Sequence, residues 1–129
     1  MRLCFIVLPA CWLSWTQAAR AEVIPLSCQV VMEASGELDR RSVLIDPDRR
    51  TVRDNDMTFT NGAVSPFGPN LQEFVAVEGG RATWGIRMKP SGTPVSVFTY
   101  DRHTGSYTVA GRFAGQFTRG LCRGTDEAT

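Results

Sequence analysis

The chain has 129 residues with 14 basic and 13 acidic side chains, so its formal net charge at neutral pH is only +1. Because the charges nearly balance and form no basic stripe or acidic tail along the sequence, nothing in it predicts nucleic acid as a partner. The length suits one small domain with a modest hydrophobic core.

Residues 1–21 have the layout of a secretory signal peptide. Arg2 supplies a short positive region, an apolar run follows over residues 3–15, and small residues at Ala19 and Ala21 occupy the positions that a signal peptidase reads. The apolar run is shorter than the roughly 20 residues of a spanning helix. We therefore predict an exported protein, periplasmic or secreted, that is cut after Ala21.

Three alternatives to this cleavage stay open: a cut after Ala18, an uncleaved anchor, and lipid attachment at Cys11. Removal of the signal peptide takes away Arg2 and Arg20 but no acidic residue, so 14 basic side chains become 12 against 13 acidic ones. The mature chain, residues 22–129, is thus predicted to be a nearly neutral single domain with no stable membrane span.

Two cysteines remain in the mature chain, Cys28 near its beginning and Cys122 near its end. Export implies an oxidising compartment, where such a pair is usually joined, and only one intramolecular pairing exists. We predict a Cys28–Cys122 disulfide that holds the first and last strands side by side or in facing layers. The alternative is a redox-active pair, but such pairs usually sit close together in the sequence, as in C-x-x-C.

Two-residue alternation, the signal of a β-strand, recurs along the mature chain, and no long stretch has helical periodicity. A short helical turn is the most that residues 35–42 favour. The clearest alternation puts Ala82, Trp84, Ile86 and Met88 on one side of a strand. In chain order the predicted strands cover residues 28–33, 41–46, 71–77, 81–88, 95–100, 106–113 and 115–121.

The segments between these strands have the composition of turns. Asn61-Gly62 suits a tight primed turn, Gly79-Gly80 suits a short hairpin loop, and Asp46-Pro47-Asp48 combines a capping carboxylate with a ring that presets φ. Paired prolines mark longer loops at 65–70 and 89–94. Seven to nine short strands with turns about every ten residues predict an all-β fold, a small antiparallel sandwich or barrel.

His103, the only histidine, lies in one of these turns, between Asp101 and Ser106. A histidine base needs a nucleophile within about 3 Å and usually an orienting carboxylate. Neighbours on a turn rarely converge in that way, and no G-x-S-x-G elbow is present. We predict that Asp101 caps the turn, that Gly105 takes a left-handed conformation, that His103 is exposed, and that the protein has no catalytic residue.

Metal and cofactor sites are not predicted either. One histidine and two disulfide-bonded cysteines cannot assemble the usual zinc ligands. Calcium has weak candidates in Asp46 and Asp48, and in Asp54, Asn55 and Asp56, but turn-forming carboxylates paired with neighbouring arginines explain these residues as well.

Aromatic residues occur in nearly all the predicted strands, as expected for the core of a small barrel or sandwich. In an open barrel, some of them would line an apolar ligand pocket. Phe67 lies instead in a proline-rich loop, where it is either a partner contact or a lid on the core. The aromatic set is Phe59, Phe67, Phe74, Trp84, Phe98, Tyr100, Tyr107, Phe113 and Phe117.

The early cysteine, "LIDPDRRTV", the central tryptophan strand, "YDRHTGSYTV" and the final "GLC" together resemble small exported proteins of Gram-negative bacteria without an assigned activity. A fainter resemblance is to periplasmic lysozyme inhibitors, small disulfide-closed β-barrels that insert an "SG-x-x-Y" loop into the enzyme. The nearest stretch here is "TGSYTVAGRF", in which Tyr107 comes too early.

Taken together, these patterns predict a non-enzymatic exported β-domain that binds a protein or an envelope component through its loops. The alternatives are a β-barrel carrier of a small apolar ligand and a protein that acts like a lysozyme inhibitor. The partner and the oligomeric state do not follow from the sequence.

Overall fold

The computed structural model describes residues 22–32, 34–111 and 117–125, and the side chains of all these residues except 117 and 118. The predicted signal peptide, residues 1–21, lies outside this part of the chain. The described residues contain nine strands and no helix. The strands are β1 (Ile24–Met32), β2 (Leu38–Asp46), β3 (Thr51–Asp54), β4 (Met57–Thr60), β5 (Leu71–Glu78), β6 (Arg81–Met88), β7 (Pro94–Asp101), β8 (Ser106–Gly111) and β9 (Phe117–Gly124).

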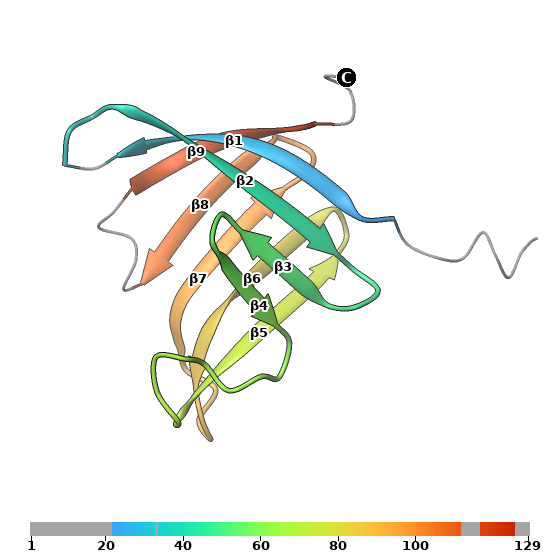
Figure 1. Ribbon diagram of the computed structural model, residues 1–129, viewed down its shortest axis with the longest axis vertical. Helices are drawn as coiled ribbons and strands as arrows, with labels where there is room; N and C mark the ends of the chain where they lie inside the picture. The colour runs from blue at the N-terminus through green and yellow to red at the C-terminus, as the bar shows by residue number, and fades with distance from the viewer. Residues whose placement is uncertain (1–21, 33, 112–116, 126–129) are drawn as a thin grey trace, which may run out of the picture.

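All nine strands belong to one antiparallel sheet of order β4-β3-β2-β1-β9-β8-β7-β6-β5, which curls into a nearly closed barrel (Figure 1). The segment after β4 narrows the remaining gap, because its backbone bonds to β5. Gly62 N donates to Glu73 O at 2.9 Å, Glu73 N donates to Ala63 O at 2.8 Å, and Ser65 N donates to Leu71 O at 2.9 Å. The predicted all-β class is therefore confirmed, in its barrel form.

The predicted disulfide is present between Cys28 and Cys122, which are 94 residues apart in the sequence. The two cysteines face each other in the register of β1 and β9, with their Cα atoms 3.9 Å apart. The first and last strands thus lie side by side rather than in facing layers. The disulfide therefore links the first strand of the barrel covalently to the last.

Large aromatic rings in mutual contact fill the barrel. Trp84 and Phe98 are stacked with ring centroids 6.0 Å apart, and Phe59 and Tyr107 pack around them at 5.7–6.4 Å. Aliphatic side chains from β1, β2, β3, β5, β6 and β8 complete the core. The alternation predicted for residues 81–88 is confirmed except at its end, where Met88 is exposed.

Two predicted members of the aromatic core lie outside it. Phe74 is on the outer side of β5, where the guanidinium of Arg87 lies 5.8 Å from its ring centroid. Phe67 is 57% exposed, so it does not act as a lid on the core. Phe113 lies outside the described residues, and the side chain of Phe117 is not described.

The predicted turns have mixed outcomes. Gly79 and Gly80 form the β5–β6 hairpin loop with φ values of 60° and 80°, which explains the two glycines. A turn is also present at Asn61-Gly62, but it redirects the chain after β4 and does not join two adjacent strands. The helical turn expected within residues 35–42 was wrong, because β2 begins at Leu38 and pairs with β1 from there on.

Candidate functional site

His103 lies at the tip of the β7–β8 turn, as predicted. Asp101 Oδ1 accepts the backbone N–H of His103 at 2.8 Å, and Gly105 closes the turn with a φ of 76°. The Ser106 hydroxyl bonds to the Thr104 hydroxyl at 3.1 Å, away from the imidazole. No nucleophile–histidine–carboxylate chain is assembled among these residues, which are held together by turn geometry.

The described residues contain no group of three or more His, Cys, Asp and Glu side chains that could hold a metal ion. Of the weak calcium candidates, Asp46 caps its turn by accepting the Arg49 N–H at 3.2 Å. Asp54 was predicted to be a turn-forming carboxylate paired with a neighbouring arginine. That prediction was wrong, since Asp54 is the last residue of β3, is only 1% exposed and pairs with Arg41 on β2.

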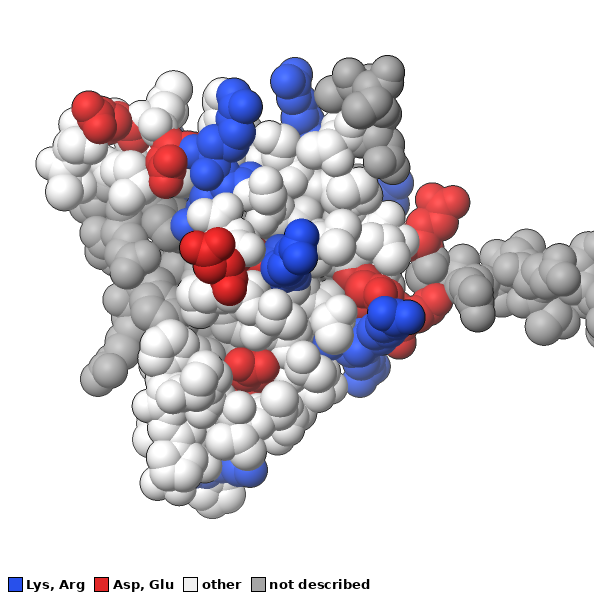
Figure 2. Space-filling view, viewed as in Figure 1, with Lys and Arg blue, Asp and Glu red and all other residues white. Residues whose placement is uncertain are grey.

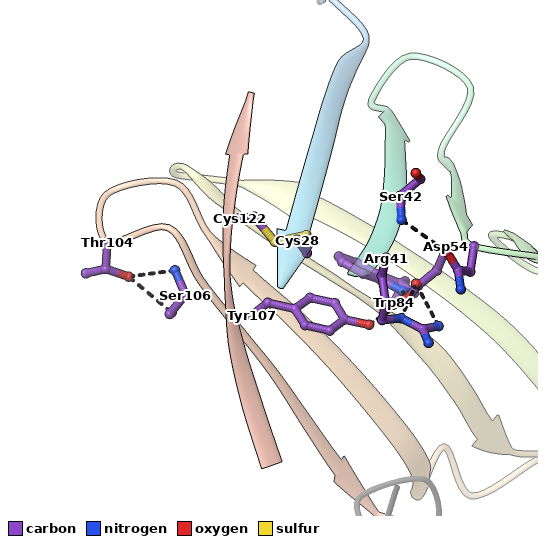
Figure 3. Close-up of a disulfide and its surroundings, with 10 residues drawn as sticks. Cys28, Arg41, Ser42, Asp54, Trp84, Thr104, Ser106, Tyr107 and Cys122 are labelled. Atoms are coloured by element: carbon purple, nitrogen blue, oxygen red, sulfur yellow. Dashed lines mark hydrogen bonds and ion pairs between the residues drawn. A yellow bond between two sulfur atoms is a disulfide. The ribbon is translucent and has the colours of Figure 1, made fainter. Parts of the chain in front are cut away.

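Asp54 is the centre of a buried polar cluster that spans the barrel (Figure 3). Its Oδ1 accepts from Nε of Arg41 at 3.0 Å and lies 2.9 Å from Nη2 of the same guanidinium. Its Oδ2 accepts from the Tyr107 hydroxyl at 2.7 Å and from Trp84 Nε1 at 3.2 Å. We call Arg41, Asp54, Trp84 and Tyr107 the Asp54 cluster.

The strand register places these four side chains together. Arg41 and Asp54 lie at inward-facing positions of the paired strands β2 and β3, with Arg41 two residues before the position opposite Asp54. Trp84 and Tyr107 reach them from β6 and β8. Arg41 is directly opposite Cys28 on β1, so the cluster lies beside the disulfide. Figure 3 shows Tyr107 extending from its strand toward Asp54 below the sulfur atoms.

Burial and charge set the ionisation of the cluster. Burial raises the pKa of the Tyr107 hydroxyl far above its ordinary value, and the Asp54 carboxylate raises it further. Burial alone would lower the pKa of Arg41, but the charge of Asp54 and the hydrogen-bonding interactions with Asp54 and Tyr107 together outweigh it, so the pKa is raised. The cluster therefore holds a charged guanidinium and a neutral phenol at physiological pH.

The barrel encloses the hydrogen-bonded groups of the Asp54 cluster. The Asp54 carboxylate already accepts from three side chains, and both it and Tyr107 are shielded from solvent. A buried ion pair that is also hydrogen-bonded satisfies the charges it brings inside. The tyrosine nearest to the lysozyme-inhibitor motif is thus an interior residue.

Comparisons with protein-family models, curated proteins and solved structures gave no significant match. Function must therefore be argued from the surface of this molecule alone. The described residues contain no helix that is long and apolar enough to cross a membrane.

One end of the barrel presents exposed apolar side chains. Val64, Phe67 and Met88 are 59%, 57% and 45% exposed, and they lie on the β4–β5 loop and at the adjoining end of β6. Lys89 N donates to Asn70 O at 2.9 Å, which joins the two segments. We call this surface the Phe67 end.

The β4–β5 loop is held by its own hydrogen bonds. The Ser65 hydroxyl accepts the Phe67 N–H at 3.1 Å, and Gly68 N and Leu71 N donate to Ser65 O and Gly68 O at 3.3 and 3.2 Å. Residues 61–70 include no charged side chain, and Lys89 is the only one within 88–94. Figure 2 accordingly shows few charged atoms at this end of the molecule, at the bottom of the view.

Proposed function

We propose that the protein is an exported, non-enzymatic binding module whose Phe67 end contacts a protein partner in the cell envelope. The observation that carries the proposal is an aromatic side chain that is more than half exposed although its loop is hydrogen-bonded in place. An ordered loop loses little conformational entropy on binding, and exposed aromatic residues are favoured as contact anchors.

The neighbours of Phe67 support this reading. Val64 and Met88 extend the apolar surface, and the absence of charge from residues 61–70 means that binding would desolvate few ions. Prolines at 66, 69 and 90 restrict the backbone of both segments. Apolar groups grouped in this way typically mark a protein–protein contact.

The packed interior favours a binding module over the carrier alternative. Trp84, Phe98, Phe59 and Tyr107 occupy the space that a ligand of a barrel carrier would need. The Asp54 cluster adds buried charge to the same space, which suits an apolar ligand poorly. Mass spectrometry of denatured protein purified from its native host checks this alternative, because a carrier would release a small molecule.

The test is affinity capture from an envelope extract with the mature protein as bait. We expect the variant Phe67→Ser/Met88→Ser to lose a protein that the wild type retains, while the control Val23→Ser, which removes an apolar residue as exposed as Met88 but outside the Phe67 end, keeps it. Identical captured proteins from all three baits would refute the role of the Phe67 end. If the protein lost is a lysozyme, inhibition of cell-wall hydrolysis at micromolar bait decides whether the module is an inhibitor.

A further inference from the structure

The barrel has a second distinctive surface, on the outer side of β2, β1 and β9. Arginine and leucine alternate there, because side chains two residues apart point to the same side of a strand. On β2 the outward positions include Leu38, Arg40 and Leu44, and on β9 they are Arg119, Leu121 and Arg123. We call these six residues the Arg–Leu face.

The charge of this face is one-sided. No carboxylate of the described residues lies within ion-pair distance of Arg40, Arg119 or Arg123. Asp46, the one acidic residue at an outward position of these strands, is at the end of β2 and contacts Arg49 at 3.8 Å. Among the other described acidic residues near this face, Glu37, Asp39 and Asp56 lie at strand ends and in turns. Glu22, before β1, lines a neighbouring hollow with Arg123 but forms no ion pair with it.

The opposite outer side of the barrel differs. Its outward charged residues on β5, β6 and β7 are Arg81, Arg87, Glu78 and Asp101, which balance, and Arg81 lies 3.9 Å from Asp101. The sheet topology therefore gathers arginines on one side of a chain whose overall charge is close to zero.

A hollow of about 270 Å³ lies at the centre of the Arg–Leu face. Arg40 and Arg123 line it from opposite sides, with Leu121, Ser27 and Gln29 between them. The register places Arg40 opposite Gln29 and Arg123 opposite Ser27. The two arginines are thus separated by two interstrand spacings and by two residues along the strands, which puts their Cα atoms about 12 Å apart. Two extended guanidinium groups can reach one phosphate from that separation, and the hydroxyl and amide add donors.

The leucines identify the kind of partner. Leu38 and Leu121 are 67% and 66% exposed, and Leu38 and Leu44 are about 20 Å apart along β2. Protein interfaces favour aromatic anchors over leucine, and no described side chain of the Arg–Leu face is aromatic. Basic residues mixed with aliphatic ones are typical of surfaces that rest on lipid headgroups and dip into the acyl boundary.

We propose that the Arg–Leu face docks onto a lipid surface with phosphate-bearing, anionic headgroups, and that Arg40 and Arg123 hold a headgroup phosphate in the hollow between them. The leucines rest against the acyl boundary beside it. This surface lies apart from the Phe67 end, so the protein can sit on a membrane and still offer its loops to a partner.

Sedimentation with vesicles of phosphatidylcholine, with and without about one-third phosphatidylglycerol, tests the proposal. We expect the mature protein to bind only the anionic vesicles, and binding to fall as salt is raised. Arg40→Gln/Arg123→Gln should weaken binding at least tenfold, since each arginine near such a surface contributes about a fivefold gain in affinity. Leu38→Ser/Leu121→Ser should weaken it at unchanged charge.

The matched control is Arg81→Gln/Arg87→Gln, which removes the same charge from the opposite side and should change binding less than about twofold. Equal loss in both arginine variants would overturn the proposal, because binding would then depend on net charge alone. So would absence of binding by folded wild-type protein. Binding of soluble polyglutamate in place of vesicles, with the same dependence on Arg40 and Arg123, would replace the lipid with an acidic protein surface.

Discussion

The Tyr107 hydroxyl on β8 donates to Asp54 Oδ2 on β3 at 2.7 Å, across the interior of the barrel. Three strands, β2, β1 and β9, separate β3 from β8 in the sheet, and 53 residues separate the partners in the chain. Trp84 donates to the same oxygen from β6. One carboxylate therefore ties together strands from both halves of the sheet.

Replacement of Asp54 by alanine should lower the free energy of unfolding by about 3–5 kcal/mol, because it leaves the Arg41 charge and the Tyr107 hydroxyl without their shared acceptor. Tyr107→Phe should cost less, about 1.5–3 kcal/mol, since the ion pair remains. Urea unfolding of both variants measures the two values. A loss below about 1 kcal/mol for Asp54→Ala would mean that the cluster contributes little to stability.

Alkaline pH should destabilise the protein through Tyr107. Burial and then Asp54 raise the pKa of this hydroxyl in the folded state, whereas the unfolded chain ionises near pH 10. The stabilisation is thus fully present below about pH 10 and is lost progressively above it, where the unfolded state releases a proton that the folded state keeps. Unfolding measured between pH 8 and about pH 11 should show this decline, and Tyr107→Phe should make it shallower. An equal slope in both proteins would assign the decline to other groups.

Much of the fold follows from patterns in the sequence. The alternation of Ala82, Trp84 and Ile86, the glycine pair at 79–80 and the single possible disulfide each depend on neighbouring residues or on simple counting, and each prediction was confirmed. The sequence did not distinguish a sandwich from a barrel, because the barrel depends on contacts between β5 and the segment that follows β4. Nothing local to either segment encodes that pairing.

The inward and outward sides of the short strands were harder to predict. In β5 the acidic Glu73 points inward and its neighbour Phe74 points outward, the reverse of what polarity suggests. Glu73 is satisfied inside because its Oε1 accepts the Thr60 N–H at 2.9 Å. Asp54 is the same case, since the turn signal of "RDNDM" hides a carboxylate that binds Arg41 on the neighbouring strand and also Trp84 and Tyr107 on two distant strands. Likewise, the arginines of the Arg–Leu face come together only in the folded sheet.

Reduction of the Cys28–Cys122 disulfide should lower the free energy of unfolding by about 4–5 kcal/mol, the chain-entropy value for a loop of this length. For a domain of ordinary stability that is a large share of the total. Denaturant unfolding of the Cys28→Ser/Cys122→Ser variant, beside the oxidised wild type, measures the difference. An unchanged midpoint would show that the strand pairing of β1 with β9 needs no covalent support.

Replacement of Ser96 by alanine should stabilise the protein. The Ser96 hydroxyl is completely buried on β7 and has no hydrogen-bond partner among the described residues. A buried hydroxyl without a partner loses its hydration and gains nothing in return, so its removal should raise the free energy of unfolding by up to about 1 kcal/mol. Ser27→Ala, on the outer side of β1, is the matched control and should have almost no effect. If Ser96→Ala instead lowers stability by about 1 kcal/mol or more, the hydroxyl contributes a hydrogen bond to the folded barrel.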